Sequence, residues 1–124
     1  MGAGNGRQIL IVDEDVLTVI EAEAALREAS YQTAHLTTPA GFWAKLDYVR
    51  PDVLLIDINM NRFNGIGLLG ELREREDYED MVIVLFSDRE ADELQQICVD
   101  NDVNGYFCKS HEMSQLPEFI ENFE

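Results

Sequence analysis

Apolar residues in this chain gather in short unbroken runs at regular intervals. Three of the runs are continuously apolar, namely Ile9–Val12, Val53–Ile56 and Met81–Phe86. Continuous apolar character, without alternation, is typical of strands that helices cover on both faces. Two weaker runs, Thr33–Leu36 and Gly105–Cys108, fall in the same rhythm. We therefore predict five strands in a buried parallel sheet.

The segments between the runs carry apolar residues at helical spacing. Strand starts near residues 8, 32, 53, 81 and 105 lie 21 to 28 residues apart, which leaves room for the crossover helix that each parallel neighbour requires. A last helix is expected over Leu116–Phe123, where Pro117 suits the first helical turn. The expected fold class is α/β, with one doubly wound domain. The apolar positions that mark the first four helices are Val16, Ile20, Ala24 and Leu26, then Phe42 and Leu46, then Leu68, Leu69 and Leu72, then Leu94, Ile97 and Cys98.

Length and composition agree with one folded domain. The 124 residues are 46% hydrophobic, which suits a chain with a single core. Residues 1–7 look like a flexible leader without the apolar centre of a signal peptide, and residues 8–124 like the domain itself. No apolar run approaches the ~20 residues that cross a bilayer. Cys98 and Cys108 lack metal-site spacing and fit reduced thiols, so we expect a cytoplasmic protein.

The charge of the chain excludes one class of partner. Its 25 acidic and 9 basic residues give a net charge of −16. Such a surface repels phosphodiester backbones, so we expect that this domain does not itself bind nucleic acid. A solvated acidic surface accounts for most of these acids. It does not account for acids placed directly at the ends of predicted strands.

Polar side chains follow four of the predicted strands. They are Asp13, Glu14 and Asp15 after the first strand, Asp57 after the third, Ser87 and Asp88 after the fourth, and Lys109 after the fifth. The carboxyl ends of parallel strands share one edge of the sheet, where the functional crevice of such folds lies, so we expect these groups to converge. Asp15 and Asp88 fit equally well as caps of the helices that follow. Converging carboxylates repel one another and favour a bridging hard cation such as Mg²⁺.

Within this arrangement, Asp57 is the candidate for a reactive carboxylate. A carboxylate can act as a nucleophile and form an acyl phosphate. Phosphoryl transfer asks the protein mainly for positioning and for charge cancellation on the transferring oxygens. A divalent cation, the Lys109 ammonium and the Ser87 hydroxyl supply those contacts. Asp57 is therefore the candidate phosphoacceptor.

Four segments resemble the landmark segments of response regulator receiver domains, in order and in separation. They are ILIVDED, VLLIDINMNRFNG, VIVLFSD and NGYFCKS, and the resemblance runs from about Gln8 to the C-terminus. It implies a CheY-like, flavodoxin-like (βα)5 sheet of strand order 2-1-3-4-5, and a signalling domain rather than a classical enzyme. In two-component signalling of this kind, a histidine kinase or a phosphotransfer protein would donate a phosphoryl group to Asp57.

The resemblance also implies roles for other residues. Ser87 and Lys109 would contact the phosphoryl group, and Tyr106 would be the aromatic residue that swings inward on activation. The magnesium ligands that it implies are Asp13, Glu14, Asp57 and the backbone carbonyl of Asn59. The output surface would comprise the outward face of Glu90–Asp102, Tyr106 and the last helix. This surface would contact a downstream protein or an output domain, and a phosphorylation-dependent dimer of the chain is a further expected assembly.

Several positions depart from the pattern of the family. Glu14 stands where the second acid is most often Asp, which lengthens one ligand of an ion that demands near-ideal distances. Asp88 places a negative charge beside the phosphorylation site, where a small residue is usual. Asn61 and Ser110 replace frequent prolines. Without a proline after Lys109, a cis peptide would cost about 2.5–4 kcal/mol, so the trans form is expected.

Two positions beside the site are expected to set the lifetime of the phosphoryl group. Asn59 and Arg89 lie two residues after Asp57 and Ser87, where the family tunes the access of water. Neither is a carboxylate or an obvious general base. We therefore expect slow loss of the phosphoryl group, and a half-life of only seconds would contradict this expectation.

Two other classes of function compete with a phosphorylatable receiver. A receiver-like module that binds partners without phosphorylation is favoured by Glu14, Asp88 and the missing prolines, and is opposed by Asp57 and Lys109. Among enzymes, a haloacid-dehalogenase-type phosphatase would need an aspartate as general acid where Asn59 stands. The P-loop pattern GxxxxGK[ST] is absent, and three acids in the first loop would repel the phosphate of a flavin.

Overall fold

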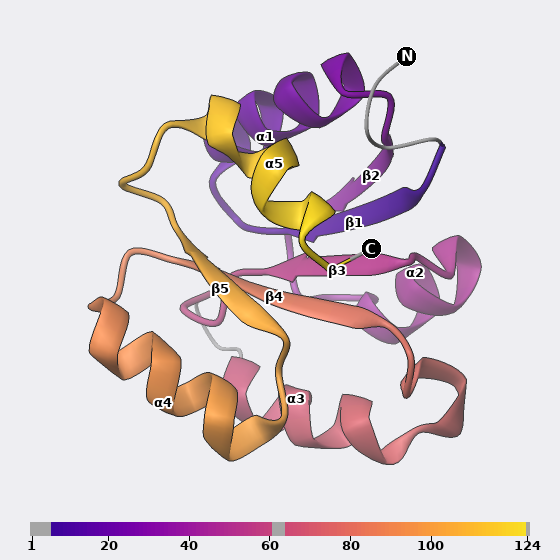
Figure 1. Ribbon diagram of the computed structural model, residues 1–124. Coiled ribbons are helices and arrows are strands. Elements are labelled where there is room, and N and C mark those ends of the chain that lie inside the picture. Colours follow the sequence, from indigo (N-terminus) through magenta and orange to yellow (C-terminus); the bar gives the residue numbers. More distant parts are fainter. Residues whose placement is uncertain (1–5, 61–63, 124) are drawn as a thin grey trace.

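A twisted five-stranded sheet lies between two layers of helices in the computed structural model, which describes residues 6–60 and 64–123 (Figure 1). The four strand pairings are parallel, and the strand order is β2-β1-β3-β4-β5. The strands are β1 (Gln8–Val12), β2 (Gln32–Leu36), β3 (Val53–Ile56), β4 (Val82–Ser87) and β5 (Gly105–Cys108). The predicted strands, fold class and strand order are confirmed.

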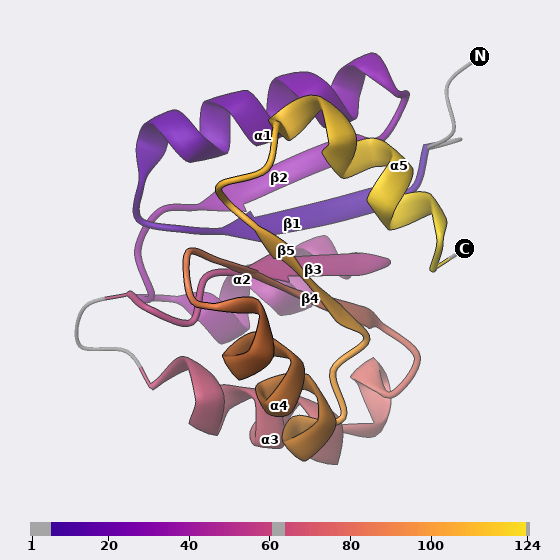
Figure 2. The same ribbon diagram turned by 60° about the vertical axis from the view of Figure 1, so that its left-hand side comes forward.

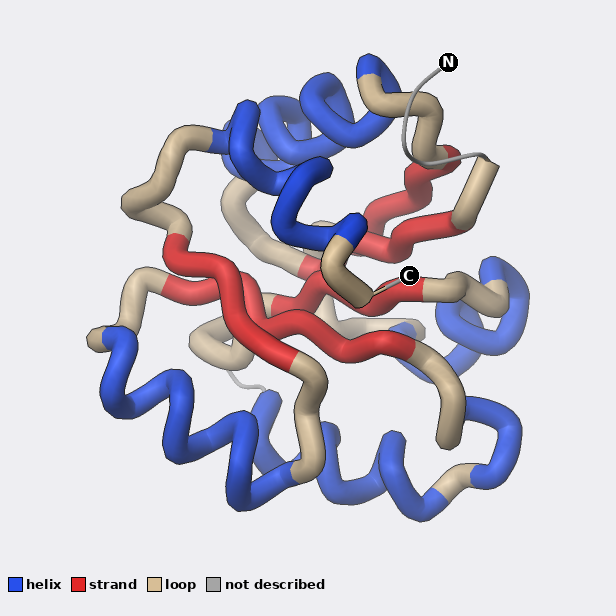
Figure 3. The backbone as a smooth tube through the Cα atoms, in the orientation of Figure 1, coloured by secondary structure: helices blue, strands red, loops and turns tan. Residues whose placement is uncertain are grey.

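Helices alternate with the strands and divide into two layers. Helices α1 and α5 cover one face of the sheet, and α2, α3 and α4 cover the other (Figures 1 to 3). Their bounds are α1 (Val16–Glu28), α2 (Phe42–Val49), α3 (Gly65–Glu74), α4 (Ala91–Asn101) and α5 (Leu116–Glu121), with short 3-10 helices η1 (Glu76–Tyr78) and η2 (Met113–Gln115). Helix α5 therefore ends two residues before the predicted end.

Alternate residues of each central strand supply the two halves of the core. Leu54 of β3 lies beside Leu10 and Ile83 in the half that α2, α3 and α4 cover. Its neighbour Val53 belongs to the half under α1 and α5. All four residues of β3 are buried, and each fully buried aliphatic side chain contributes about 2 kcal/mol of hydrophobic free energy. The strand that ends at Asp57 is thus held on both faces.

The predicted apolar face of α1 is wrong at three positions. Val16 and Ile20 are 55% and 56% exposed, and Ala24 is exposed as well. Leu26 is buried as predicted, but it is joined by Val19 and Ala22. Apolar residues form more than one stripe on this helix, and spacing alone does not tell which stripe meets the sheet.

Three expectations concern the backbone and the parts of the chain that the structure covers. Residues 1–5 and Asn61 lie outside the described residues, so the bounds of the leader and the effect of Asn61 stay predictions. No peptide bond among the described residues is cis, which confirms the trans form after Lys109. In the described ranges, no helix combines the length and the apolar character needed to span a membrane.

Candidate functional site

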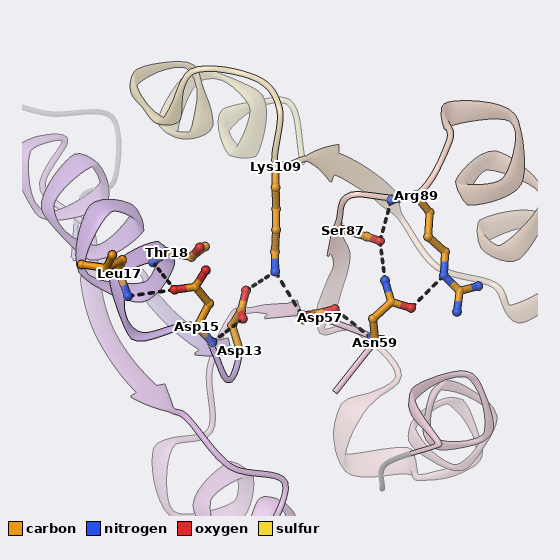
Figure 4. A network of polar contacts seen from close by, with 9 residues as sticks. All are labelled: Asp13, Asp15, Leu17, Thr18, Asp57, Asn59, Ser87, Arg89 and Lys109. Atoms are coloured by element: carbon orange, nitrogen blue, oxygen red, sulfur yellow. Dashed lines mark hydrogen bonds and ion pairs between the residues drawn. The ribbon is translucent and has the colours of Figure 1, made fainter. Parts of the chain in front are cut away.

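The carboxyl ends of four strands bring predicted site residues together at one edge of the sheet (Figure 4). Asp13 follows β1, Asp57 follows β3, Ser87 ends β4 and Lys109 follows β5. The parallel ladder continues past the strands, because the Asp57 N–H donates to the Val12 carbonyl and the Lys109 N–H to the Ser87 carbonyl, each at 2.9 Å. The backbone therefore fixes where these side chains begin. The predicted convergence is confirmed for these four residues.

Lys109 is the centre of the site. Its Nζ lies 2.6 Å from Asp13 Oδ2 and 3.0 Å from Asp57 Oδ2. Burial acts to lower the pKa of Lys109, but hydrogen bonds and charges from Asp13 and Asp57 outweigh that effect, so its pKa is raised. Lys109 is therefore a cation at neutral pH. It offsets the repulsion between two carboxylates that are only 1% and 8% exposed.

Asp13 has an oxygen that the protein does not fully use. Its Oδ1 accepts the Asp15 N–H at 2.9 Å, whereas Oδ2 is buried and accepts no hydrogen bond of regular geometry beside its ion pair with Lys109. Burial raises the pKa of Asp13, against the lowering effect of Lys109 and the Asp15 N–H. Two nearby carboxylates of this kind suit a hard cation with oxygen ligands.

The other two acids of the first loop do not join this cluster. Asp15 caps α1, since its Oδ1 accepts the N–H groups of Leu17 at 3.0 Å and Thr18 at 3.3 Å. Hydrogen bonds with Thr18 lower the pKa of Asp15, and its reading as a helix cap is confirmed. Glu14 is exposed. Within residues 6–60 and 64–123, no three His, Cys, Asp or Glu side chains are grouped to hold a metal ion, so Glu14 as a ligand stays a prediction.

A chain of hydrogen bonds joins Ser87 to the two residues expected to tune the site. The Asn59 side chain donates from Nδ2 to Ser87 Oγ at 3.1 Å, and the Arg89 N–H donates to the same oxygen at 3.1 Å. Arg89 Nε donates to Asn59 Oδ1 at 2.8 Å, and the Asn59 N–H donates to Asp57 Oδ1 at 2.8 Å. Asn59 thus links the carboxylate of Asp57 to the fully buried hydroxyl of Ser87 (Figure 4).

Sequence reasoning placed Asn59 and Arg89 beside the site but missed that they bind each other. Arg89 also binds Glu93, whose carboxylate accepts a hydrogen bond from Arg89 Nη1 at 2.8 Å. The spacing of Arg89 and Glu93, four residues apart at the start of α4, was the available signal. The predicted role of the Asn59 carbonyl as a magnesium ligand stays a prediction.

The predictions for Tyr106 and Asp88 have different outcomes. Tyr106 lies on β5 beside Leu85 of β4, half-buried and packed against the core under α4, and its switching role stays a prediction. Asp88 is exposed. Its reading as a helix cap is wrong, because Glu90 holds the N-cap position of α4 and no side chain caps that helix.

Comparison with known protein families gives one match that covers most of the chain. The model of the family described as response regulator receiver domain matches residues 9–121. The transcriptional regulatory protein KdpE of Staphylococcus aureus is 27% identical over 119 residues, which are 94% of this chain and 49% of that protein. The DNA-binding transcriptional activator EvgA of Escherichia coli is 26% identical over 113 residues, 90% of this chain and 54% of that protein. The chain thus spans about half the length of these curated relatives.

Solved structures share the fold at low sequence identity. The chemotaxis response regulator CheY4 of Vibrio cholerae superposes with a TM-score of 0.86 at 19% identity, and the match covers 96% of this chain and 99% of that one. The receiver domain of the sensor histidine kinase PA1611 of Pseudomonas aeruginosa gives a TM-score of 0.81 at 19% identity, covering 95% and 97% of the two chains. That structure holds a magnesium ion coordinated in its active-site cleft.

Proposed function

This chain belongs to the response regulator receiver domain family, and on that premise we propose that Asp57 accepts a phosphoryl group from a phosphohistidine donor. The donor would be a histidine kinase or a phosphotransfer protein. The family is a signalling domain of two-component systems, and its members act with kinases and output domains. A cytoplasmic location, with no membrane or nucleic acid bound by this domain itself, belongs to the same proposal.

One observation carries the proposal. Lys109, a cation, lies within 3.0 Å of the Asp57 carboxylate, at the sheet edge where Asp13 and Ser87 also converge. A carboxylate buried to this degree is costly unless it is paired, and the Lys109 ammonium supplies the pair. The same ammonium is placed to neutralise charge on oxygens that arrive at Asp57.

The proposed reaction moves one phosphoryl group between two protein side chains. An oxygen of the Asp57 carboxylate attacks phosphorus and forms an O–P bond, while the N–P bond of the phosphohistidine breaks. The imidazole leaves with the electron pair of that bond and takes up a proton. The Lys109 ammonium would contact one oxygen of the phosphoryl group on Asp57. The Ser87 hydroxyl would contact a second oxygen once it has moved from its position beside Asn59.

The acidic residues beside Asp57 fit a magnesium ion. Asp13 and Asp57 would hold it through carboxylate oxygens, with Glu14 and the Asn59 carbonyl as further ligands if the Glu14 side chain turns inward. When bound, Mg²⁺ would supply positive charge against the phosphoryl oxygens. The burial of the Asp13 and Asp57 carboxylates beside each other is the structural feature that supports this assignment.

A phosphorylation-independent interaction module is the second candidate. The observation that favours it is the exposed position of Glu14, since the bound form of the site would need that residue to move. Asp57 paired with Lys109 favours the phosphoacceptor instead, because a pure binding module has no use for a buried carboxylate pair at this edge.

Intact mass measurement separates the two candidates. The chain is incubated with Mg²⁺ and acetyl phosphate, and we expect a gain of one phosphoryl group. The gain should disappear in Asp57→Asn and with a chelator, and should remain in the matched control Asp88→Asn. No gain from acetyl phosphate or from a panel of phosphorylated histidine kinases would favour the interaction module.

A further inference from the structure

A groove is lined by residues of α4, β5 and the C-terminal segment that includes α5. Strand β5 lies at the opposite edge of the sheet from β2 (Figure 1). The volume of the groove is about 850 Å³, and its apolar lining includes Cys98, Val103, Gly105, Phe119 and Phe123. Strand β5 is the edge strand of the sheet, so no further strand covers it. The short α5, six residues long, leaves the strand open. Val99 stands at the rim of the groove and is 67% exposed.

The aromatic residues at the chain end shape the floor of this groove. A Cβ atom on Gly105 would lie 2.9 Å from the Phe123 ring, so that ring rests on the strand backbone only because the position is glycine. Phe119 packs between Phe107 and Phe123, with ring centroids 5.6 and 5.3 Å away. The floor of the groove therefore consists of packed aromatic rings and of strand backbone at Gly105, which has no side chain. Such a surface suits an inserted aliphatic or aromatic side chain.

The charged side chains that line the groove have one sign, although the Arg73 guanidinium of α3 lies at its edge, where Nε donates to the Asp102 carbonyl at 2.7 Å. Two of its lining residues are acidic, Asp102 at the end of α4 and Glu118 on α5, and no lysine or arginine lines it. Over residues 90–123 the sequence has eight acids and a single Lys or Arg, Lys109. The ammonium of Lys109 points away from this face, to Asp13 and Asp57. The groove therefore combines an apolar floor with an acidic rim.

The distribution of acidic residues argues against a second copy of the chain as the molecule that binds in the groove. A two-fold interface would set the same surface against itself, so acids would face acids across the rim. Like charges in contact are costly, and within the screening length of about 8 Å at physiological salt they repel. No lysine or arginine among the lining residues would offset this repulsion.

We propose that the groove docks a basic amphipathic segment of a partner protein. An apolar side chain of that segment would lie on the floor beside Phe119 and Phe123, and its lysine or arginine residues would face Asp102 and Glu118. The inference rests on the proposed function in taking this face as the output surface of the receiver, and it names the chemistry of the partner. A phosphorylation-dependent dimer, if it forms, would therefore use another face.

The test is a nuclear magnetic resonance titration of the ¹⁵N-labelled chain with a short helical peptide of leucine and lysine. We expect the amide shifts to concentrate at Val99, Gly105 and Phe119. Peptides with glutamate in place of lysine, or serine in place of leucine, should bind at least about tenfold more weakly, a factor that corresponds to about 1.4 kcal/mol. Shifts spread over the acidic surface, or centred on another face, would overturn the proposal.

Charge variants provide the matched control. Asp102→Asn with Glu118→Gln should weaken the leucine–lysine peptide about five- to tenfold at low salt, as expected for two rim charges. Glu71→Gln with Glu74→Gln removes two exposed acids from α3 and should change the affinity less than about twofold. Equal effects of the two pairs would show non-specific attraction and overturn the proposal.

Analytical ultracentrifugation of the chain, with and without beryllofluoride, tests whether a second copy binds in the groove. The chain should not dimerise through this face in either state, and a dimer whose formation broadens the Val99 and Gly105 signals would overturn the proposal. The titration is performed on unphosphorylated protein. Its result therefore stands apart from whether Asp57 accepts a phosphoryl group, so failure of one proposal is distinguishable from failure of the other.

Discussion

Lys109 decides the electrostatics of the site at the scale of single residues. Asp13 and Asp57 would repel each other without it, and neither is exposed enough for water to screen the repulsion. Its raised pKa has a defined consequence for stability. The stabilisation is fully present below the pKa of lysine in the unfolded chain, and it is lost as pH rises through the higher pKa of the folded state.

Replacing Lys109 by methionine should lower the free energy of unfolding at pH 7 by about 3 kcal/mol, because two buried carboxylates lose their cation. Urea unfolding followed by circular dichroism measures the change. Lys45→Met, at the only other lysine in the sequence, is the matched control and should stay within about 0.5 kcal/mol of the wild type. Adding Asp13→Asn to Lys109→Met should restore part of the loss. A double variant no more stable than Lys109→Met would contradict this account.

Arg89 controls a second residue-level feature, the position of the Ser87 hydroxyl. Its guanidinium holds Asn59, and Asn59 holds Ser87 Oγ. Ser87 Oγ accepts the hydrogen bond from Asn59, so a hydroxyl that moves towards a phosphoryl group would give up that bond. Weakening this connection is therefore expected to favour the phosphorylated form of the site.

Replacing Arg89 by alanine should speed phosphorylation by acetyl phosphate about fivefold, which corresponds to the loss of one hydrogen bond of about 1 kcal/mol. The rate is read from intact mass against time. Glu93→Gln removes the ion pair of Arg89 with α4 but leaves its bond to Asn59, and should change the rate less than about twofold. A slower reaction of Arg89→Ala would mean that Arg89 assists the donor instead.

At the scale of elements, one side-chain pair ties α2 to the turn before β4. The Tyr78 hydroxyl, from η1, donates to Asp47 Oδ1 of α2 at 2.5 Å. Burial, followed by the hydrogen bond and charge of Asp47, raises the pKa of Tyr78 to about 12. Tyr78 is 3% exposed, so its side of the contact is shielded from water, whereas the Asp47 carboxylate is exposed. The folded state therefore favours the neutral form of the Tyr78 phenol over the ionised form.

Tyr78 should make stability depend on pH in the alkaline range. An unfolded tyrosine ionises near pH 10, so the stabilisation is fully present below pH 10 and is lost as pH rises towards the folded pKa of about 12. We expect the wild type to lose about 2 kcal/mol more than Tyr78→Phe across this window in urea unfolding. Tyr48→Phe, at a tyrosine that is 87% exposed, should follow the wild type. Equal slopes for all three proteins would contradict the assignment.

The elements differ in how well the sequence predicts them. Strands β3 and β4 are buried on both faces, so their apolar runs carry their identity without ambiguity. Helix α1 has apolar residues on more than one stripe, and only packing shows that Val19 and Ala22, rather than Val16 and Ile20, meet the sheet. The convergence of Asp13, Asp57 and Lys109 follows from parallel strands ending at one edge, which sequence order alone implies.

Other parts of the site and surface depend on contacts that no local pattern encodes. The bond between Asn59 and Arg89 joins two loops thirty residues apart and depends on both side-chain conformations. The groove beside β5 depends on the short α5 and on the close approach of Phe123 to Gly105. Position in sequence gives neither the length of the last helix nor the direction of these rings.

At the scale of the whole molecule, the two proposals concern two different surfaces. The strand-end site gathers its charges inward, where Lys109 balances Asp13 and Asp57. The face along β5 carries acids outward and leaves an apolar floor between them. Strand β5 contributes to both, since Lys109 follows its last residue and Gly105 begins it. A shift of Lys109 at the strand-end site would therefore be transmitted along the backbone of β5 to the groove.

The most direct test of the central claim is to locate the phosphoryl group in the protein. The chain is treated with acetyl phosphate and Mg²⁺, the acyl phosphate is reduced with borohydride to homoserine, and the modified peptide is sequenced by mass spectrometry. The account predicts homoserine at position 57, and none in the Asp57→Asn variant. Homoserine at Asp13, Asp15 or Asp88, or a wild-type chain without homoserine after treatment, would contradict it.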